Sequence, residues 1–386
     1  MRRRCVRALP PLFPAVALVA WPVFAPLSAQ VAVGGGITLE SYTFDVPENT
    51  SFEKLTLMTL PFQASIDLTD DLNVSVGGAF AEGEMTLEDE STLTISGLTD
   101  TSIRASYTLG QDRVVLSGAV FLPTGKVNLT AEEARVAGAV AYDLLPTHVT
   151  NWGTGGGADV SIAFALPAGA VSLGARVGYR LVSEYEPYDE GVEPFGDIGG
   201  GEVFVYDPGD QFYVRAALDA NLSDASKFTL TGTFQSFSDD ATEGTNIFRS
   251  GSRMQGMASL IFPAGASGSA WLYGGVLHRG EGEFLELVEG EVRTSQNVFF
   301  GGAGARVLIG GVGLVPVVEA RGLKTDDGFG QGWTLGAGGS LEIPLGDGPA
   351  LVPTAKFRLG RVLVSDLVES DFTGFEIGAS LRGIGR

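Results

Sequence analysis

Residues 62–68 read Phe-Gln-Ala-Ser-Ile-Asp-Leu, and every second side chain in this stretch is apolar. Residues 227–235, Lys-Phe-Thr-Leu-Thr-Gly-Thr-Phe-Gln, repeat the alternation with small polar partners. Successive side chains of an extended strand point to opposite faces, so a period of two predicts a strand with one apolar and one polar face. Such stretches recur along the whole chain, which is the pattern of an all-β, transmembrane, antiparallel up-and-down β-barrel.

The first residues have the composition of a secretory signal peptide. Four arginines among residues 2–7 precede an apolar run over 8–24, and residues 27–29, Leu-Ser-Ala, have the form of a cleavage site. The expected organisation is therefore a signal peptide over 1–29 and one barrel over 30–386. The single cysteine, Cys5, falls in the leader, so no disulfide or thiolate chemistry is expected in the barrel.

Sixteen segments fit strands, and fourteen remain an alternative if the first or the fourth segment is misassigned. The segments lie near 32–46, 55–69, 72–85, 98–109, 113–123, 157–167, 170–184, 210–221, 226–238, 247–262, 269–282, 294–309, 312–323, 331–345, 350–363 and 373–384. An even number is the rule for bacterial barrels of one chain.

The connectors between these segments are alternately tight and long. Turn-forming Gly, Asp and Pro residues make the tight ones, at 70–71, 110–112, 167–169, 222–225, 263–265, 310–311 and 346–348. Longer connectors fall near 47–54, 86–97, 124–156, 185–209, 239–246, 283–293, 324–330 and 364–372. Short periplasmic turns and long outer loops are typical of the outer membrane of Gram-negative-type bacteria, and they predict that both termini are periplasmic.

The charged residues of the predicted strands alternate with the apolar rows, which supports the assignment of one face to lipid and one to the lumen. Rows such as Val171, Leu173, Ala175 and Val177 are expected to face lipid. Lys or Arg facing lipid at mid-membrane costs roughly 2–4 kcal/mol, so charged side chains should take the other face. The predicted lumen residues are Arg104, Arg113, Arg176, Arg180, Arg215, Lys227, Arg306, Arg321, Lys356, Arg358, Asp159, Asp219, Glu319 and Glu342, and Asp67, Glu376 and Arg382 share their phase.

The net charge bounds the partners of the chain. The formal charge is −21, and removal of the four leader arginines makes the remainder four units more negative. This charge argues against a nucleic-acid partner. The acids gather in the long connectors near 82–90, 184–197 and 281–291, so the predicted rim is acidic while the predicted wall is basic. The partners expected are outer-membrane lipid and lipopolysaccharide, the barrel-assembly machinery and small solutes, and a homo-oligomer is compatible with this sequence.

The third outer connector, 124–156, is the longest. Thr130 followed by two glutamates resembles a helix start, and Val136, Ala139, Val140 and Leu144 would form one apolar stripe over 134–145. Folded into the barrel mouth, the loop would narrow the pore. The constriction residues expected are Lys126, Glu132, Glu133, Arg135, Asp143, His148 and Trp152. A surface lid or a contact to a neighbouring subunit is the alternative.

Two family resemblances follow from this loop. Its position and length resemble the eyelet loop of sixteen-stranded general porins. Residues 122–125, Leu-Pro-Thr-Gly, together with 153–157, Gly-Thr-Gly-Gly-Gly, resemble outer-membrane barrels of the phenol-degradation meta-pathway type. Those barrels are relatives in architecture of long-chain fatty-acid transporters. The first resemblance implies a channel for polar solutes, and the second implies a transporter of apolar compounds.

Residues for other chemistry are sparse. The two histidines, His148 and His278, lack metal-ligand spacing, so no metal, cofactor or catalytic residue is predicted and an enzyme is not expected. His278 is predicted on the lumen phase. The preferred function is passive diffusion of small polar or charged solutes. One alternative is a structural barrel whose lumen is closed by its own arginine–carboxylate network. The other is transport of apolar or aromatic compounds, for which an apolar pocket would be lined by Val136, Val140, Tyr142, Leu144, Leu145 and Trp152.

Overall fold

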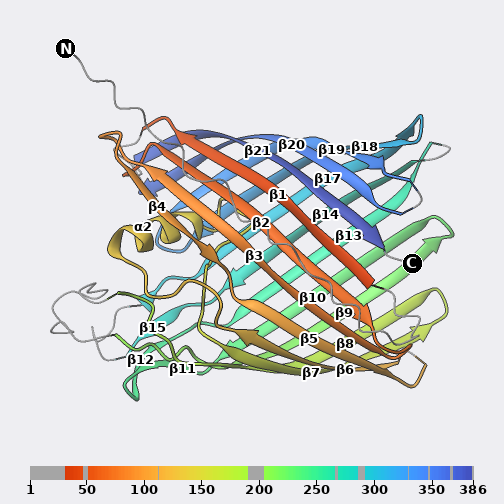
Figure 1. Cartoon of the computed structure of the whole chain (residues 1–386), viewed down its shortest axis with the longest axis horizontal. Helices are drawn as coiled ribbons and strands as arrows, with labels where there is room; N and C mark the ends of the chain where they lie inside the picture. Colours follow the sequence, from red (N-terminus) through yellow and green to blue (C-terminus); the bar gives the residue numbers. More distant parts are fainter. Residues whose placement is uncertain are drawn as a thin grey trace, which may run out of the picture.

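The computed structural model describes residues 31–46, 51–111, 113–189, 204–265, 268–285, 292–328, 330–346, 348–365 and 368–384. These residues form one closed antiparallel β-barrel (Figure 1). The signal peptide predicted over 1–29 lies outside the described residues. Short turns gather at one end of the barrel, and the longer loops gather at the other end together with the helix α2 (Ala131–Val140).

Sixteen positions around the barrel wall are filled by strands, which confirms the predicted number. The first half is formed by β1 (Val31–Phe44), β2 (Lys54–Asp67), β3 (Leu72–Thr86), β4 (Thr92–Leu98) with β5 (Thr101–Leu109), β6 (Val114–Leu122), β7 (Gly157–Ala168), β8 (Val171–Val182) and β9 (Gln211–Ser223). The second half is formed by β10 (Ser226–Phe237), β13 (Arg253–Ala264), β14 (Gly268–Arg279), β17 (Gln296–Ile309), β18 (Val312–Thr325), β19 (Gln331–Pro344), β20 (Ala350–Ser365) and β21 (Val368–Ile384).

The first and last strands close the barrel. Ala32 lies opposite Ile384 and Phe44 lies opposite Phe372, with antiparallel pairing along the whole of β1. Strands β4 and β5 share one position, because β5 pairs with the first part of β3 and β4 with its last part. Both ends of the barrel sequence therefore lie at the end with the tight turns, as an even strand number requires.

The tight turns are formed by residues whose backbone requires glycine. Gly310 and Gly311 join β17 to β18 with φ of 57° and 88°, a conformation that residues with a Cβ rarely adopt. Two consecutive positive φ values match the twist of the flanking strands, which is why such turns are preferred in hairpins. The predicted short connectors at this end are confirmed.

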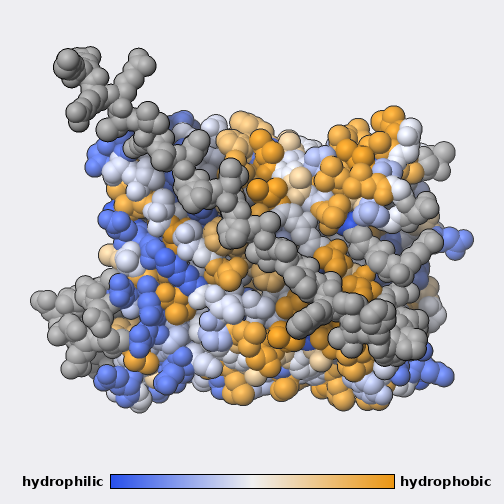
Figure 2. Space-filling model, viewed as in Figure 1, coloured by the Kyte–Doolittle hydropathy of each residue, from blue (hydrophilic) through white to orange (hydrophobic). Residues whose placement is uncertain are grey.

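The two faces of the wall differ in polarity. Large apolar side chains on the outer face are exposed to the surroundings, among them Val160 (63%), Phe164 and Leu166 on β7. Figure 2 shows hydrophobic residues over much of the visible wall, and hydrophilic residues at the end that carries the long loops. An apolar outer band of this extent is stable only against hydrocarbon, so the chain is a membrane-spanning barrel.

Some predicted boundaries were wrong where strands leave the wall. The segment predicted over 247–262 is two strands, because β12 (Thr245–Arg249) ends before β13 begins at Arg253. β12 belongs to a separate four-stranded sheet, together with β11 (Asp239–Thr242), β15 (Gly282–Phe284) and β16 (Val292–Arg293). The segment 269–282 ends at Arg279, and the last strand begins five residues before the predicted start. β4 was not predicted. β4 does alternate, but Leu93 and Ile95 are buried with the third loop while Thr92, Thr94 and Ser96 are exposed, so the strand lacks the lipid-facing apolar row that marks the wall.

Candidate constriction site

The helix α2 begins where the sequence predicts. The Thr130 hydroxyl accepts a hydrogen bond from the Glu133 backbone N–H at 3.3 Å, and the Glu133 carboxylate accepts one from the Thr130 N–H at 3.2 Å. This reciprocal capping satisfies two backbone donors that a helix start leaves free. The helix ends at Val140, so the expected extension to Leu145 was wrong. No helix among the described residues is long and apolar enough to span a membrane.

The third loop lies inside the barrel and packs on the inner face of β2, β3 and β4. Val136 and Val140 are fully buried in a cluster with Leu57 and Ile95 from that wall. At Gly83 the approach is close enough that a Cβ would lie 3.1 Å from Val136 and 3.2 Å from Trp152. The small residue therefore permits the helix to reach the wall.

Trp152 returns the loop to the same wall. Its side chain is 2% exposed, and its indole N–H donates to the carbonyl oxygen of Ala81 on β3 at 3.0 Å. A buried indole contributes a large apolar area and needs one acceptor for its N–H, and both conditions are met here. Trp152, predicted as a constriction residue, is thus an anchor and does not face the pore.

Asp100, between β4 and β5, joins the two motifs on which a family resemblance rests. One carboxylate oxygen accepts the Gly125 N–H at 3.0 Å, and the other accepts the Thr154 N–H at 2.7 Å and its hydroxyl at 3.0 Å. The glycines are necessary because a Cβ on Gly125 or Gly153 would collide with backbone. Asp100 is not among the residues predicted from the sequence, because a separation of 25 residues from Gly125 follows no local spacing rule.

The tip of the loop crosses to the opposite wall. The Tyr142 hydroxyl donates to the carbonyl oxygen of Gly330, at the start of β19, at 2.5 Å. Asp143 forms an ion pair with Arg279 of β14 at 3.1 Å and a hydrogen bond with Gln296 of β17. The loop is therefore held at both sides of the mouth, which is the geometry of a constriction.

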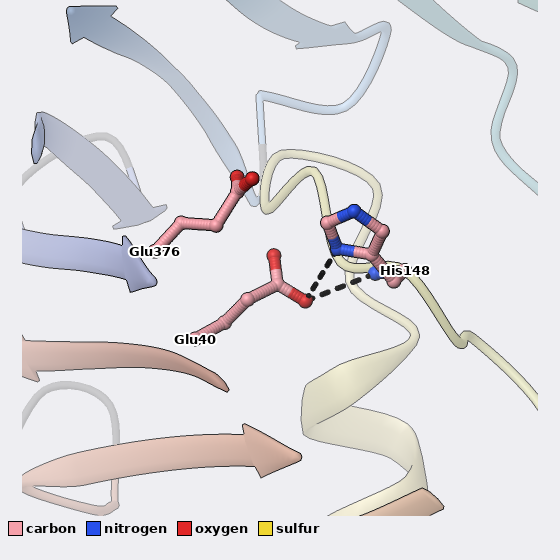
Figure 3. A group of neighbouring side chains, drawn as sticks. All are labelled: Glu40, His148 and Glu376. Carbon is pink, nitrogen blue, oxygen red and sulfur yellow. Dashed lines mark hydrogen bonds and ion pairs between the residues drawn. The ribbon is translucent and has the colours of Figure 1, made fainter. Parts of the chain in front are cut away.

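His148 ties the loop to β1. Its Nδ1 lies 3.0 Å from Glu40 Oε2, and its backbone N–H donates to the same oxygen at 3.1 Å (Figure 3). The hydrogen bond to Glu40 raises the pKa of His148 above its ordinary value, against the effect of partial burial. Glu40 is 0% exposed and was not among the predicted site residues.

Glu40, His148 and Glu376 form a group whose ligand atoms lie within 4.8 Å of one another, a spacing that suits a metal ion. The cations around these three residues favour a role in ion pairing over metal binding. Lys356 Nζ lies 3.3 Å from the Glu376 carboxylate and an Arg358 nitrogen lies 2.5 Å from it. These cations already compensate the carboxylates and would repel a divalent ion, so the group is explained as part of an ion-pair network.

That network lines the inner face of β18 to β21. Arg358, 3% exposed, bridges Glu319 and Glu376, and Lys356 contacts the same two carboxylates. Nearer the turns, Arg306 pairs with Glu342 at 2.6 Å. Three of the predicted lumen residues, Lys356, Arg358 and Glu319, are thus brought together with Glu376, and Arg306 and Glu342 form a separate pair.

The opposite wall, β5 to β10, carries charges that remain more exposed. Arg104 and Arg176 approach Asp159 at 3.7 Å, and Tyr213 donates to the same carboxylate at 2.8 Å. The other predicted lumen residues of this wall are Arg180, whose guanidinium stacks 4.1 Å above the ring of Phe121, Arg215, and the pair Lys227–Asp219 at 3.1 Å. Arg113 lies in the turn before β6 and is exposed at the barrel end.

A cavity of about 310 Å³ lies in the lumen beside the third loop. Pro146 of the loop faces Tyr273, Phe300, Glu319, Arg321 and Arg358 across it. Arg321, another predicted lumen residue, is thereby placed inside the barrel.

The other predicted constriction residues divide into two groups. Lys126 and Glu133 form an ion pair with each other, whereas Glu132 and Arg135 are exposed on the helix. The apolar residues that would line a pocket for apolar compounds instead pack against the wall: Val136, Val140, Leu144, Leu145 and Trp152 are buried, and Tyr142 packs against the same cluster.

His278 was placed on the wrong face. It lies opposite Met254 and Asn297, on the phase of the exposed Leu272, and hydrogen-bonds Asn297 at 3.0 Å. Its neighbour Leu277 faces the lumen cavity. Successive side chains of a strand alternate between the two faces, so an error of one position in the assumed phase reverses the face of every side chain.

Comparison with known proteins gives similar barrels but no family. No protein-family model and no curated protein matches the chain. An outer-membrane channel from Pseudomonas putida F1 is 10% identical, with 93% of this chain and 97% of that chain covered and a TM-score of 0.38. OccK11 of Pseudomonas aeruginosa is 9% identical, with 93% and 96% covered and a TM-score of 0.46.

An anion-selective porin from Comamonas acidovorans is 13% identical, with 92% of this chain and 99% of that chain covered and a TM-score of 0.42. The protein from Pseudomonas putida F1 is an outer-membrane channel by name, and the protein from Comamonas acidovorans is a porin by name. At such identities and with TM-scores below one half, the similarities carry no argument about the solute or the function of this chain.

Proposed function

We propose that the chain is a channel of the outer membrane of a Gram-negative-type bacterium, through which small polar and charged solutes diffuse passively. The observation that carries this proposal is the third loop, which crosses the mouth from β3 to β14 and leaves the charged wall of β5 to β10 uncovered. On this proposal the tight turns and both termini are periplasmic, and lipid and lipopolysaccharide surround the apolar band.

The pattern of ion pairs supports one wet and one dry half of the lumen. On β18 to β21, Lys356, Arg358, Glu319 and Glu376 are paired and shielded from solvent, although Arg321 on β18 has no ion pair among the described residues. On the other wall Arg215 is exposed, and so are Lys227 and Asp219, which pair with each other. A charged side chain in contact with water needs no partner of opposite charge, because water solvates it. A charged side chain shielded from water does need such a partner. The wet half is the proposed path.

The charges along this path favour anions. The lumen-facing groups of β5 to β10 are five cationic side chains and two carboxylates: Arg104, Arg176, Arg180, Arg215 and Lys227 against Asp159 and Asp219. The excess positive charge lowers the energy of an anion in the lumen and raises that of a cation. The acidic rim acts at larger distance, where salt screens it more strongly.

Reconstitution into a planar lipid bilayer tests both the channel and its preference for anions. We expect stepwise conductance, and a reversal potential in a salt gradient whose sign reports anion preference. A complete lack of conductance by correctly folded protein would contradict the channel and favour a barrel closed by its own charge network. Conductance with cation preference would retain the channel and reject the assignment of the path to the basic wall.

A further inference from the structure

A second cavity, of about 380 Å³, lies among the outer loops. It is bounded by the connector after β8, by β12 and by the strands β15 and β16. Six aromatic side chains line it: Tyr185, Tyr188, Phe204, Tyr206, Phe248 and Phe284. We call this cavity the aromatic mouth pocket. Its volume lies within the range of pockets that bind small molecules.

The aromatic rings form two walls. Phe204 stacks on Tyr206 with centroids 6.2 Å apart and planes within 19°, and Tyr185 meets Tyr206 edge to face at 5.8 Å. On the other side Phe248 and Phe284 are cross-strand partners with centroids 4.8 Å apart. Aromatic faces and edges both line the cavity, and a planar aromatic ring can pack against either of them.

The walls are held by the backbone. Tyr185 and Tyr206 exchange two backbone hydrogen bonds at 2.9 Å and 2.8 Å. The Tyr206 hydroxyl donates to Asp240 at 2.6 Å, and the other oxygen of Asp240 accepts the Gly209 N–H at 2.8 Å. Each carboxylate oxygen thereby accepts one hydrogen bond from the wall, so Asp240 fixes the positions of Tyr206 and Gly209.

The pocket also carries an excess of positive charge, because two arginines and one carboxylate, Asp240, line it. Arg253 and Arg293 line it, and Arg253 lies directly opposite Arg279 in the β13–β14 pairing. Like charges at such positions are destabilising unless an anion lies between them. Asp143 forms its close ion pair with Arg279, at 3.1 Å, and no carboxylate in the described part of the chain lies within salt-bridge distance of Arg253 or Arg293. Among the described residues, Nε of Arg253 and Nε of Arg279 are buried without a hydrogen-bond partner.

We propose that the aromatic mouth pocket binds a planar aromatic carboxylate, with its ring between the two aromatic walls and its carboxylate on Arg253 and Arg293. A carboxylate supplies the missing acceptors, and a guanidinium binds it through two parallel hydrogen bonds. The inference rests on the proposed function in one respect: a channel gives the site a solute to capture. Binding itself does not require conduction.

Calorimetric titration of the full chain in lipid nanodiscs with benzoate tests the proposal. We expect saturable binding, with weaker binding of acetate, which lacks the ring, and of benzyl alcohol, which lacks the charge. Loss of a charge-assisted hydrogen bond costs about 1.5–3 kcal/mol, so Arg253→Gln with Arg293→Gln should weaken benzoate binding roughly tenfold or more. Phe248→Ala should weaken benzoate but not acetate.

The matched control is Arg215→Gln, which removes a lumen arginine outside this pocket and should leave binding unchanged. Arg293→Gln alone serves if the double variant fails to fold, because Arg293 lies on a two-residue strand outside the barrel wall. Equal affinity for acetate and benzoate, or binding insensitive to both arginines, would overturn the proposal, as would no saturable binding. Conductance of the same samples separates the two proposals: binding without conduction refutes only the channel, and conduction without binding refutes only the pocket.

Discussion

Replacing Trp152 by alanine should release the third loop from the barrel wall. The side chain is 2% exposed and its indole N–H is bonded to Ala81. Truncation of a buried aromatic side chain to alanine costs about 3–5 kcal/mol. This cost falls on the docked loop and not on the wall, because strand pairing around the barrel does not involve Trp152.

Since each 1.4 kcal/mol is a factor of ten, the ratio of undocked to docked loop should rise by roughly a hundredfold to a few thousandfold. In single-channel recordings we expect larger conductance or frequent transitions to a larger state. Trypsin cleavage after Arg135, which is exposed on α2, should become faster in the same variant.

The matched control is Trp333→Ala. Trp333 is 40% exposed on the lipid-facing side of β19, so its truncation should leave the conductance unchanged. If Trp152→Ala folds into the barrel yet keeps the conductance histogram and protease resistance of the wild type, the loop does not form the constriction. An equal change in Trp333→Ala would show a general weakening of the barrel and would also refute this reasoning.

Three further predictions follow from the charges. Because the pKa of His148 is raised, its ion pair with Glu40 stabilises the docked loop fully below the pKa of an unfolded histidine, and this stabilisation is lost as the pH rises through the pKa in the folded state. The noise of the channel current should therefore grow toward alkaline pH in the wild type. In His148→Gln the noise should not depend on pH. Arg358→Met should lower the free energy of unfolding by about 3 kcal/mol, because it leaves Glu319 and Glu376 without their guanidinium. Arg215→Met should have little effect. Urea unfolding followed by gel mobility measures both variants. Arg215→Glu should shift the reversal potential toward cations, and an unchanged potential would reject the wall of β5 to β10 as the ion path.

The barrel could be predicted from the sequence because lipid imposes a strict period of two. Every strand in contact with lipid was found within a few residues, and the glycine turns marked their ends. The failures lie where this constraint ends. β4 alternates as well, but its apolar Leu93 and Ile95 are buried in the cluster with the third loop and its polar side chains are exposed, which is the reverse of a lipid-facing strand. At β14 one residue of register sufficed to place His278 on the wrong face.

The site could be predicted only in part. The capped helix of the third loop is a local feature, so its start at Thr130 was visible in the sequence. The anchors of the loop are not local. Glu40 and His148 are 108 residues apart and meet only because the barrel closes and the loop folds back. No spacing rule encodes such a contact, and Asp100 was missed for the same reason.

The two halves of the lumen follow from one physical requirement. A loop that covers part of a charged wall removes water from it, and each charge beneath the loop must then find a partner inside the protein. Arg358, Lys356, Glu319 and Glu376 satisfy this requirement beside the loop, and His148 extends the network to the loop itself. Where the loop is absent, the requirement lapses, and Arg215 has no carboxylate within salt-bridge distance among the described residues. The rule holds for Arg358 and Glu376 but not for Arg321, which lines the cavity beside the loop and forms no ion pair within the described part of the chain, so the Nε of Arg321 still lacks an acceptor.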